Sequence, residues 1–260
     1  MHDPTNALFE ERHVDRWKYF TIGHKNHLLC NPTSEAKVDE LIELLDLSDD
    51  AHVLDMACGK GEILRRIVQR WSCRGVGVEI SAEWSAEARS KIVAANLADS
   101  VKIVQEDGAN YVGTRESLDA ALCIGASWIW GGFAGTLEAL ARWTRPQGTV
   151  VVGEPFWIGE PSQEYLKTAG HERSNFGTHA ENVRIGTEHG LHLLHALVST
   201  HEEWDHYEGY QWYAMEKYAQ EHPDDPDVGE LLSQMRKYRD IYLEWGRDEM
   251  GWAIYLFLKP

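Results

Sequence analysis

The chain has 260 residues, of which 43% are hydrophobic and 26% charged, an ordinary composition for one large globular domain. Its 42 acidic and 25 basic residues leave a formal net charge of −17, which opposes binding to the phosphate backbone of DNA or RNA. No segment approaches the ~20 apolar residues of a membrane span, and the N-terminus lacks the basic and apolar regions of a signal peptide, so we expect a cytoplasmic protein without a membrane partner.

The first predicted helix follows an N-terminal segment that is rich in aromatic residues and histidines. This segment spans residues 1–33. A helix-start signal, Asn-Pro-Thr-Ser-Glu, occupies residues 31–35, and apolar residues then recur at helical spacing. The recurring residues are Val38, Leu41, Ile42 and Leu45.

The first predicted strand is an apolar run that ends in Asp55 and breaks into a turn containing Gly59 and Gly61. A buried parallel strand has such a short apolar run, and glycines directly after it let the backbone approach a ligand. The ligand would then lie at the N-terminus of the next helix. The pattern therefore predicts a nucleotide-type ligand site.

A dinucleotide-binding fold is one alternative for this turn. Its fingerprint, Gly-x-Gly-x-x-Gly, requires a third glycine where this chain has Leu64. An ordinary strand-to-helix turn is a second alternative, but it does not account for the acidic residues that end the next two strands.

The second and third predicted strands each end in an acidic residue. Residues 74–81 form the second strand, and its Glu79 lies 18 residues after Gly61, enough for a helix and a strand. An acid at this position can accept hydrogen bonds from both hydroxyls of a ribose. The third strand, residues 101–107, delivers Asp107.

The remaining elements continue the alternation of strands and helices and then add a helical insertion. This order predicts a doubly wound parallel sheet with the ligand at the carboxyl edge of the strands. Two helical stretches, separated by Pro223 and Pro226, precede the last apolar run. The expected ranges are a strand at 117–124, a helix at 133–143, strands at 149–154 and 191–200, the helical stretches within 201–249, and a strand at 252–258.

The spacing acidic-x-x-x-Gly-x-Gly at 55–61, with acids at the next two strand ends, resembles the class I S-adenosylmethionine-dependent methyltransferases. Within them the chain is most similar to ubiquinone/menaquinone C-methyltransferase-like or glycine/sarcosine N-methyltransferase-like enzymes of bacteria. The resemblance is specific over residues 34–158. It implies a Rossmann-like, mostly parallel seven-stranded sheet with an antiparallel last strand, S-adenosylmethionine as cofactor and S-adenosylhomocysteine as product.

The same resemblance assigns a domain to residues 34–260, with a helical cap inserted at about 201–249. It gives Asp55 the ordering of the loop and the methionine end of the cofactor, Glu79 the ribose, Ile80 the adenine face and Asp107 the adenine amino group. Further cofactor contacts are implied for Ala57, Gly59, Gly61, Gly108, Ala109 and Cys123. Ala57 stands where the family commonly has glycine, which narrows the room beside the methionine moiety.

Aromatic residues follow the fourth, fifth and sixth strands and predict a small-molecule pocket at the carboxyl edge. In small-molecule methyltransferases a segment like residues 1–33 often folds over the cofactor as a lid; the alternative is a surface arm that packs its aromatic side chains. For any single tryptophan, core packing is the alternative. The substrate-binding candidates are Tyr19, His24, His27, Trp128, Trp157, Tyr207 and Trp212.

A general base is required only if the methyl acceptor carries a proton, because alignment and desolvation supply most of the rate. His206 is the first candidate because it adjoins the aromatic cluster, and Glu154, His24 and His27 are the others. The alternative for His206 is a hydrogen-bonded histidine on a strand-to-helix turn.

We expect no metal, since the fourth and fifth strand ends offer only Ser127 and Glu154 as oxygen ligands. We therefore predict methyl transfer from S-adenosylmethionine to a small-molecule acceptor, by a monomer or homodimer. The alternative function is a catalytically inactive S-adenosylmethionine-binding regulatory or partner protein, and a hydride-transferring oxidoreductase is a more distant one.

Overall fold

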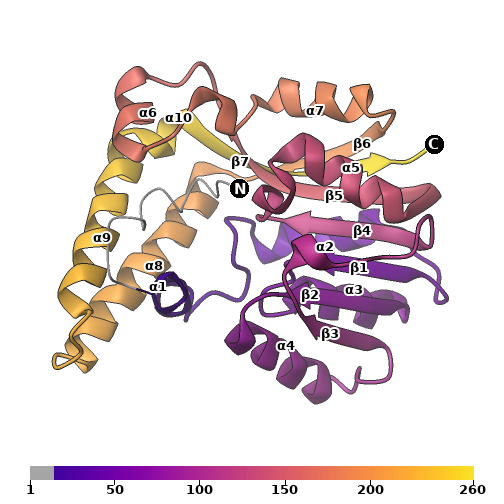
Figure 1. The fold of residues 1–260 in the computed structure, drawn as a ribbon, viewed down its shortest axis with the longest axis horizontal. Helices are drawn as coiled ribbons and strands as arrows, with labels where there is room; N and C mark the ends of the chain where they lie inside the picture. The colour runs from indigo at the N-terminus through magenta and orange to yellow at the C-terminus, as the bar shows by residue number, and fades with distance from the viewer. Residues whose placement is uncertain (1–14) are drawn as a thin grey trace.

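The computed structural model describes residues 15–260, which fold around a seven-stranded sheet (Figure 1). The strand order is β3-β2-β1-β4-β5-β7-β6, and β7 is antiparallel to both of its neighbours while the other pairs are parallel. This confirms the predicted fold class. The strands are β1 (His52–Met56), β2 (Arg74–Glu79), β3 (Val101–Gln105), β4 (Leu118–Ile124), β5 (Thr144–Trp157), β6 (His192–Val198) and β7 (Met250–Leu258).

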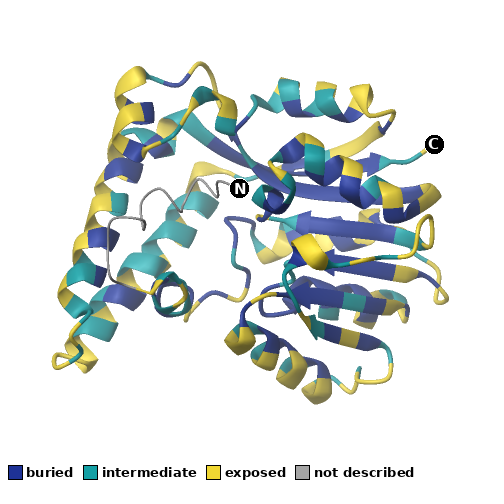
Figure 2. Ribbon diagram, in the orientation of Figure 1, coloured by how far each residue is buried: buried dark blue, intermediate teal, exposed yellow. Residues whose placement is uncertain are grey.

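Helices cover both faces of the sheet because the strands are apolar on both sides. Neighbouring residues on β1, Val53 and Leu54, belong to two different hydrophobic cores, as strand geometry requires. The strands are accordingly buried along most of their length (Figure 2). The helices of the first core are α2 (Glu35–Leu44), α3 (Glu62–Trp71) and α4 (Ala82–Ala94), and those of the second are α5 (Phe133–Trp143) and α7 (His179–Glu188).

The predicted helical cap forms a separate layer beyond the carboxyl edge of the sheet (Figure 1). Its helices are α8 (His201–Glu221) and α9 (Val228–Ile241), and Pro223 and Pro226 lie in the turn between them. The first described helix, α1 (Arg16–Gly23), packs against α8, with Tyr19 and Ile22 in a core shared with α9. The layer also contains α6 (Gln163–Ala169), a π-helix at Tyr242–Gly246 and α10 (Arg247–Glu249).

Two features of the second half differ from the sequence prediction. Strand β5 is longer than the expected 149–154, because β7 pairs with it as far as Trp157. Helices α6 and α7 were not predicted. Each is short, and their start signals, Ser162 and Thr178, accept hydrogen bonds from backbone N–H groups in the first turn.

The predicted N-terminal lid lies partly outside the described residues, because the structure describes residues 15–33 but not 1–14. Between residues 15 and 260 no helix is both long and apolar enough to cross a membrane.

Gly186 on α7 marks the closest approach of a helix to the sheet. A Cβ at this position would lie 2.2 Å from Cε1 of Phe257 on β7. We expect Gly186→Ala to lower the free energy of unfolding by about 1 to 3 kcal/mol, because overpacking forces the ring or the helix to move. Gly209→Ala on α8, where nothing lies within 4 Å, is the control and should raise it by up to about 1 kcal/mol. Urea unfolding of both variants checks this, and equal effects would contradict the packing argument.

Candidate functional site

The loop between β1 and α3 has the left-handed backbone that its glycines allow. Gly59 and Gly61 have φ angles of 53° and 73°, and Ala57 also has a positive φ, 57°. The family's usual glycine at the position of Ala57 is therefore explained by backbone geometry, which an alanine adopts only at a cost of about 1 to 2 kcal/mol. Our expectation considered only the space that its methyl group occupies.

Glu79, at the end of β2, joins this loop to the sheet. Its carboxylate accepts hydrogen bonds from the backbone N–H of Gly59 (2.9 Å) and from that of Ser81 (2.8 Å). The side chain is buried and lines the main cavity, and burial raises its pKa. Each carboxylate oxygen can accept a second hydrogen bond. Glu79 thus holds the loop and still presents acceptors to a ligand.

Asp55 lies beneath the loop rather than in the main cavity. It is buried, and it lines a small adjacent space of about 40 Å³ together with Cys30 and Lys60. Burial, with a further contribution from the nearby Glu79, raises the pKa of Asp55 to about 7. Its position fits the ordering of the loop.

The main cavity has a volume of about 650 Å³ and lies at the carboxyl edge of the sheet, under α1 and α8. Ile80 lines it and is 41% exposed, so an apolar surface at the tip of β2 faces the open space. Asp107 and Gly108 line the same end, and Asp107 accepts a hydrogen bond from the N–H of Ala109. The predicted cofactor residues Ala57, Gly59, Glu79, Ile80, Asp107 and Gly108 therefore meet in one cavity.

Three other predicted cofactor residues do not line this cavity. Cys123 on β4 is fully buried in the sheet core. Gly61 is the N-cap residue of α3, where a Cβ would lie 2.9 Å from that of Ala88 on α4, so it serves the packing of two helices. Ala109 is exposed, and its backbone N–H donates to the side chain of Asp107, which caps this turn.

Glu154 lines the opposite end of the main cavity, at the point where β5 continues beyond its last pairing with β4. It is 2% exposed. Burial raises the pKa of Glu154 to about 8, against a smaller opposing effect of the Ser127 hydroxyl. Ser127 and the predicted Trp128 line the cavity beside it.

Lys60 connects residues 15–33, which we call the N-terminal arm, to the loop between β1 and α3. Its ammonium donates hydrogen bonds to the carbonyl oxygens of His24 (2.8 Å) and His27 (3.2 Å). His24 lines the main cavity, and burial, together with His27 and Lys60, lowers its pKa to about 3. A histidine with so low a pKa is a poor general base near neutral pH.

His27 and Tyr207 connect the arm to α8. The Nε2 of His27 lies 2.9 Å from the carbonyl oxygen of Tyr207, and His27 does not line the main cavity. Tyr207 does line it, and its hydroxyl lies 3.5 Å from Nε2 of His24. We therefore assign His27 to positioning the arm rather than to binding a substrate.

The first candidate base, His206, does not line either cavity. It is exposed on α8 and packs its ring edge to face against Tyr210, 4.6 Å between centroids, away from both cavities. The sequence argument grouped consecutive aromatic residues, whereas a helix presents positions three and four apart on one face. The inward face of α8 carries Trp204, Tyr207, Glu208 and Gln211.

Trp157 is also not a pocket residue. It is fully buried, its indole N–H donates to the carbonyl oxygen of Arg173, and it packs against Tyr165 and Phe176. Because β5 runs on to Trp157, this ring lies inside the core under α6 rather than at the open edge.

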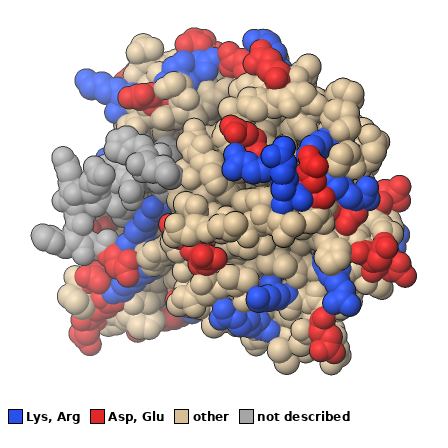
Figure 3. Space-filling view, turned by 45° about the vertical axis from the view of Figure 1, so that its right-hand side comes forward, with Lys and Arg blue, Asp and Glu red and all other residues tan. Residues whose placement is uncertain are grey.

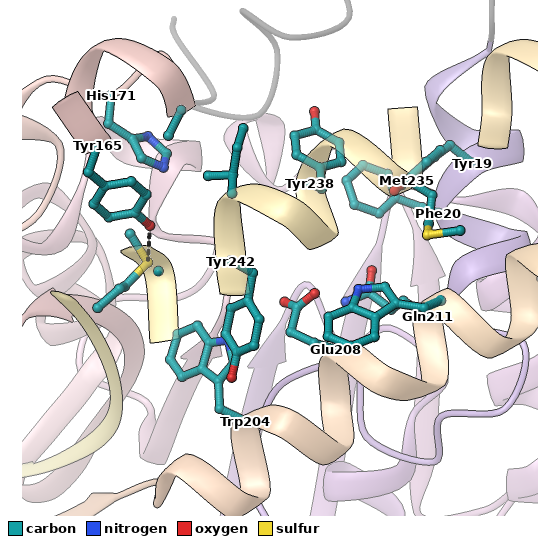
Figure 4. A pocket seen from close by; sticks show the side chains of 15 residues that line it. Tyr19, Phe20, Tyr165, His171, Trp204, Glu208, Gln211, Met235, Tyr238 and Tyr242 are labelled. Carbon is teal, nitrogen blue, oxygen red and sulfur yellow. Dashed lines mark hydrogen bonds between the residues drawn. The ribbon is translucent and has the colours of Figure 1, made fainter. Parts of the chain in front are cut away.

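Tyr19 and Trp212 line a second cavity of about 220 Å³ inside the cap (Figure 4). We call it the cap cavity. Phe20, Trp204 and Glu208 line both cavities, so the two adjoin at these side chains.

The sequence argument missed three residues of the site. Glu208 was passed over among its aromatic neighbours, although its spacing from Trp204 is helical. Lys60 was given no role in the sequence argument. Arg16, whose guanidinium lies 5.7 Å from the centre of the Trp128 ring, carried no signal in the sequence.

The described residues form neither a continuous basic surface on the face drawn nor a cluster of metal ligands. On the face drawn in Figure 3, lysines and arginines are scattered among acidic and uncharged side chains rather than gathered into one basic surface. Between residues 15 and 260, no three His, Cys, Asp or Glu side chains are grouped so as to hold a metal ion.

Comparison with known proteins adds to this geometry. A family model described as a methyltransferase domain matches residues 53–148. An Escherichia coli K12 protein, "Uncharacterized protein YjhP", is 29% identical over 94% of this chain and 99% of its own. Two crystal structures of S-adenosylmethionine-dependent methyltransferases in complex with S-adenosylhomocysteine are similar. The Geobacter sulfurreducens protein has a TM-score of 0.88 and 28% identity over 95% of this chain and 100% of its own. The Thiobacillus denitrificans protein has a TM-score of 0.86 and 29% identity over 96% and 100%.

Proposed function

The chain is a class I S-adenosylmethionine-dependent methyltransferase, and we propose that it methylates a small molecule enclosed between the carboxyl edge of the sheet and the helical cap. The observation that carries this proposal is the extent of the main cavity. It reaches from Glu79 and Ile80 at one end to Glu154 and Trp128 at the other, and its volume of about 650 Å³ is typical of a pocket that encloses small molecules.

The residues at the first end fit S-adenosylmethionine. Glu79 would accept hydrogen bonds from the ribose hydroxyls, Ile80 offers the apolar surface on which an adenine ring can pack, and Asp107 can accept from the adenine amino group. The backbone of Ala57 and Gly59 would adjoin the methionine end. When bound, the cofactor supplies an electrophilic methyl carbon, and its carbon–sulfur bonding pair stays on sulfur as the acceptor's lone pair forms the new bond.

Glu154 is our candidate for the general base in place of His206. It lies in the cavity, and its raised pKa makes the carboxylate basic enough to take a proton from an acceptor such as a phenol or an ammonium group. His24 stays neutral at neutral pH, and we assign it to orienting Tyr207. An acceptor whose reacting atom carries no proton would need no base.

Water exclusion is the task of the arm and the cap. Phe20 and His24 from the arm and Trp204 and Tyr207 from α8 line the cavity on the side away from the sheet. Lys60 couples the arm to the cofactor loop. A dry site strengthens electrostatic interactions with the reacting groups, which argues for chemistry rather than for a binding module without activity.

Calorimetry on the whole chain tests the cofactor part of this proposal. We expect S-adenosylhomocysteine to bind with one-site stoichiometry and NAD to give no heat of binding, because the turn lacks the third glycine of the dinucleotide fingerprint. Preferential binding of NAD, or no binding of S-adenosylhomocysteine, would contradict it. A screen of small metabolites that measures S-adenosylhomocysteine release then identifies the acceptor; a protein that binds cofactor but methylates nothing would favour the regulatory alternative.

A further inference from the structure

The cap cavity has one acidic side chain, Glu208, among its described lining residues. Glu208 projects from α8 into the cavity, toward α9 (Figure 4). Among the described residues, no lysine, arginine or histidine lies within ion-pair distance of its carboxylate; Arg247, the first residue of α10, is paired with Asp205 instead. Burial raises the pKa of Glu208 to about 7, so a substantial fraction is ionised at neutral pH.

The donors nearest to Glu208 are neutral indole N–H groups, which do not balance its charge. The indole N–H groups of Trp204 and Trp212 point to it and partly offset the rise in its pKa, but they carry no positive charge. A carboxylate enclosed by aromatic rings with no cation beside it is costly, and a ligand that supplies the cation would offset this cost.

Aromatic rings surround this carboxylate on several sides. Trp204 and Trp212 come from α8, Tyr242 from the π-helix, and Phe20 from α1. A π-helical segment inside an α-helix is frequent at functional sites, and here it places Tyr242 and Gly246 on the cavity wall. Rings around a negative charge are the arrangement that recognises ammonium ions, because the ring faces and the carboxylate attract the same cation.

We propose that the cap cavity is a binding site for an organic ammonium ion, whose charge lies beside Glu208 and whose alkyl groups contact the surrounding rings. The cation is of the trimethylammonium or alkylamine type, which the volume of about 220 Å³ accommodates. The site adjoins the main cavity at Phe20, Trp204 and Glu208, so a longer ligand can reach from one to the other. If the bound cation is also the methyl acceptor, this inference rests on the proposed function. The existence of the binding site itself does not depend on that function.

Glu208 changes its ionisation near neutral pH, whereas the described titratable residues that face it do not. The tyrosines from the packed elements, Tyr19, Tyr165, Tyr207 and Tyr242, have pKa values raised by burial and stay neutral. Burial lowers the pKa of His171 to about 4, so it is neutral as well. Cation affinity should therefore follow the ionisation of Glu208.

The test compares choline with its neutral isostere 3,3-dimethylbutan-1-ol by calorimetry on the whole chain. We expect choline to bind at least tenfold more tightly than the alcohol at pH 8. Affinity for choline should fall about tenfold at pH 6, because a group that titrates near pH 7 is about one-tenth ionised there. The alcohol should show no pH dependence.

Three variants locate the site. Glu208→Gln should weaken choline binding at least tenfold and remove its pH dependence, whereas Glu202→Gln, an exposed change on the same helix, should leave both unchanged. Trp212→Leu removes a ring that lines only the cap cavity and should weaken choline several-fold. A cooperative thermal unfolding transition, measured in parallel, should be retained by all three variants and shows that each is folded.

Equal affinity for choline and the alcohol, no choline binding at 50 mM, or an unchanged choline affinity in folded Glu208→Gln would each overturn the inference. Loss of S-adenosylhomocysteine binding in the unmodified protein would instead overturn the proposed function. The two failures are thus separable.

Discussion

Glu79→Ala is expected to weaken S-adenosylhomocysteine binding by about 1.5 to 3 kcal/mol, or roughly 10- to 150-fold, the range for hydrogen bonds to a charged group. The loss should lie at the upper end, because Glu79 also accepts the N–H groups of Gly59 and Ser81, and its removal frees the loop. Calorimetry with the unmodified chain and the variant measures the difference directly.

Two further variants show what the loss means. Glu79→Gln keeps the shape but weakens the acceptors, so its affinity should lie between those of the alanine variant and the unmodified chain. Glu188→Ala, an exposed change at the end of α7, should have no effect. An alanine variant that folds and retains full affinity would refute the assignment of Glu79 to the ribose.

The stability of the protein is expected to fall as pH rises from 6.5 to about 8.5, with Glu154 as the largest single contributor. Burial raises its pKa to about 8, while the unfolded carboxyl titrates near 4. Between these values the folded state binds more protons than the unfolded state, so the free energy of unfolding decreases with pH and levels off above the folded pKa. Glu154 alone should contribute about 2 kcal/mol to this decrease above pH 6.5.

The choice of pH range separates Glu154 from other buried groups. Asp55 and Glu208, with pKa values raised by burial to about 7, have lost most of their contribution by pH 7. His24 and His171, with lowered pKa values, lose stability only as pH falls below about 6.5. Urea unfolding at half-unit pH steps should give a flatter curve for Glu154→Gln than for Glu188→Gln. Parallel curves would mean that Glu154 titrates normally.

The cofactor end of the site was accessible from the sequence because its residues lie at fixed positions on local elements. Asp55, Glu79 and Asp107 each follow a short apolar run, and parallel strands bring their carboxyl ends to one edge. Strand alternation and loop glycines are properties of a few neighbouring residues. They determined the fold class and the predicted cofactor contacts, whose roles stay predictions.

The substrate end was decided by tertiary structure. Whether His206 or Glu208 faces inward depends on the phase of α8 against α1 and α9, which residue identity near position 206 does not fix. Glu154 faces the cavity because β5 continues along β7 beyond the end of β4, a pairing between residues about 100 positions apart. Burial then raises the pKa values of Glu154 and Glu208, and burial is a property of the whole packed molecule.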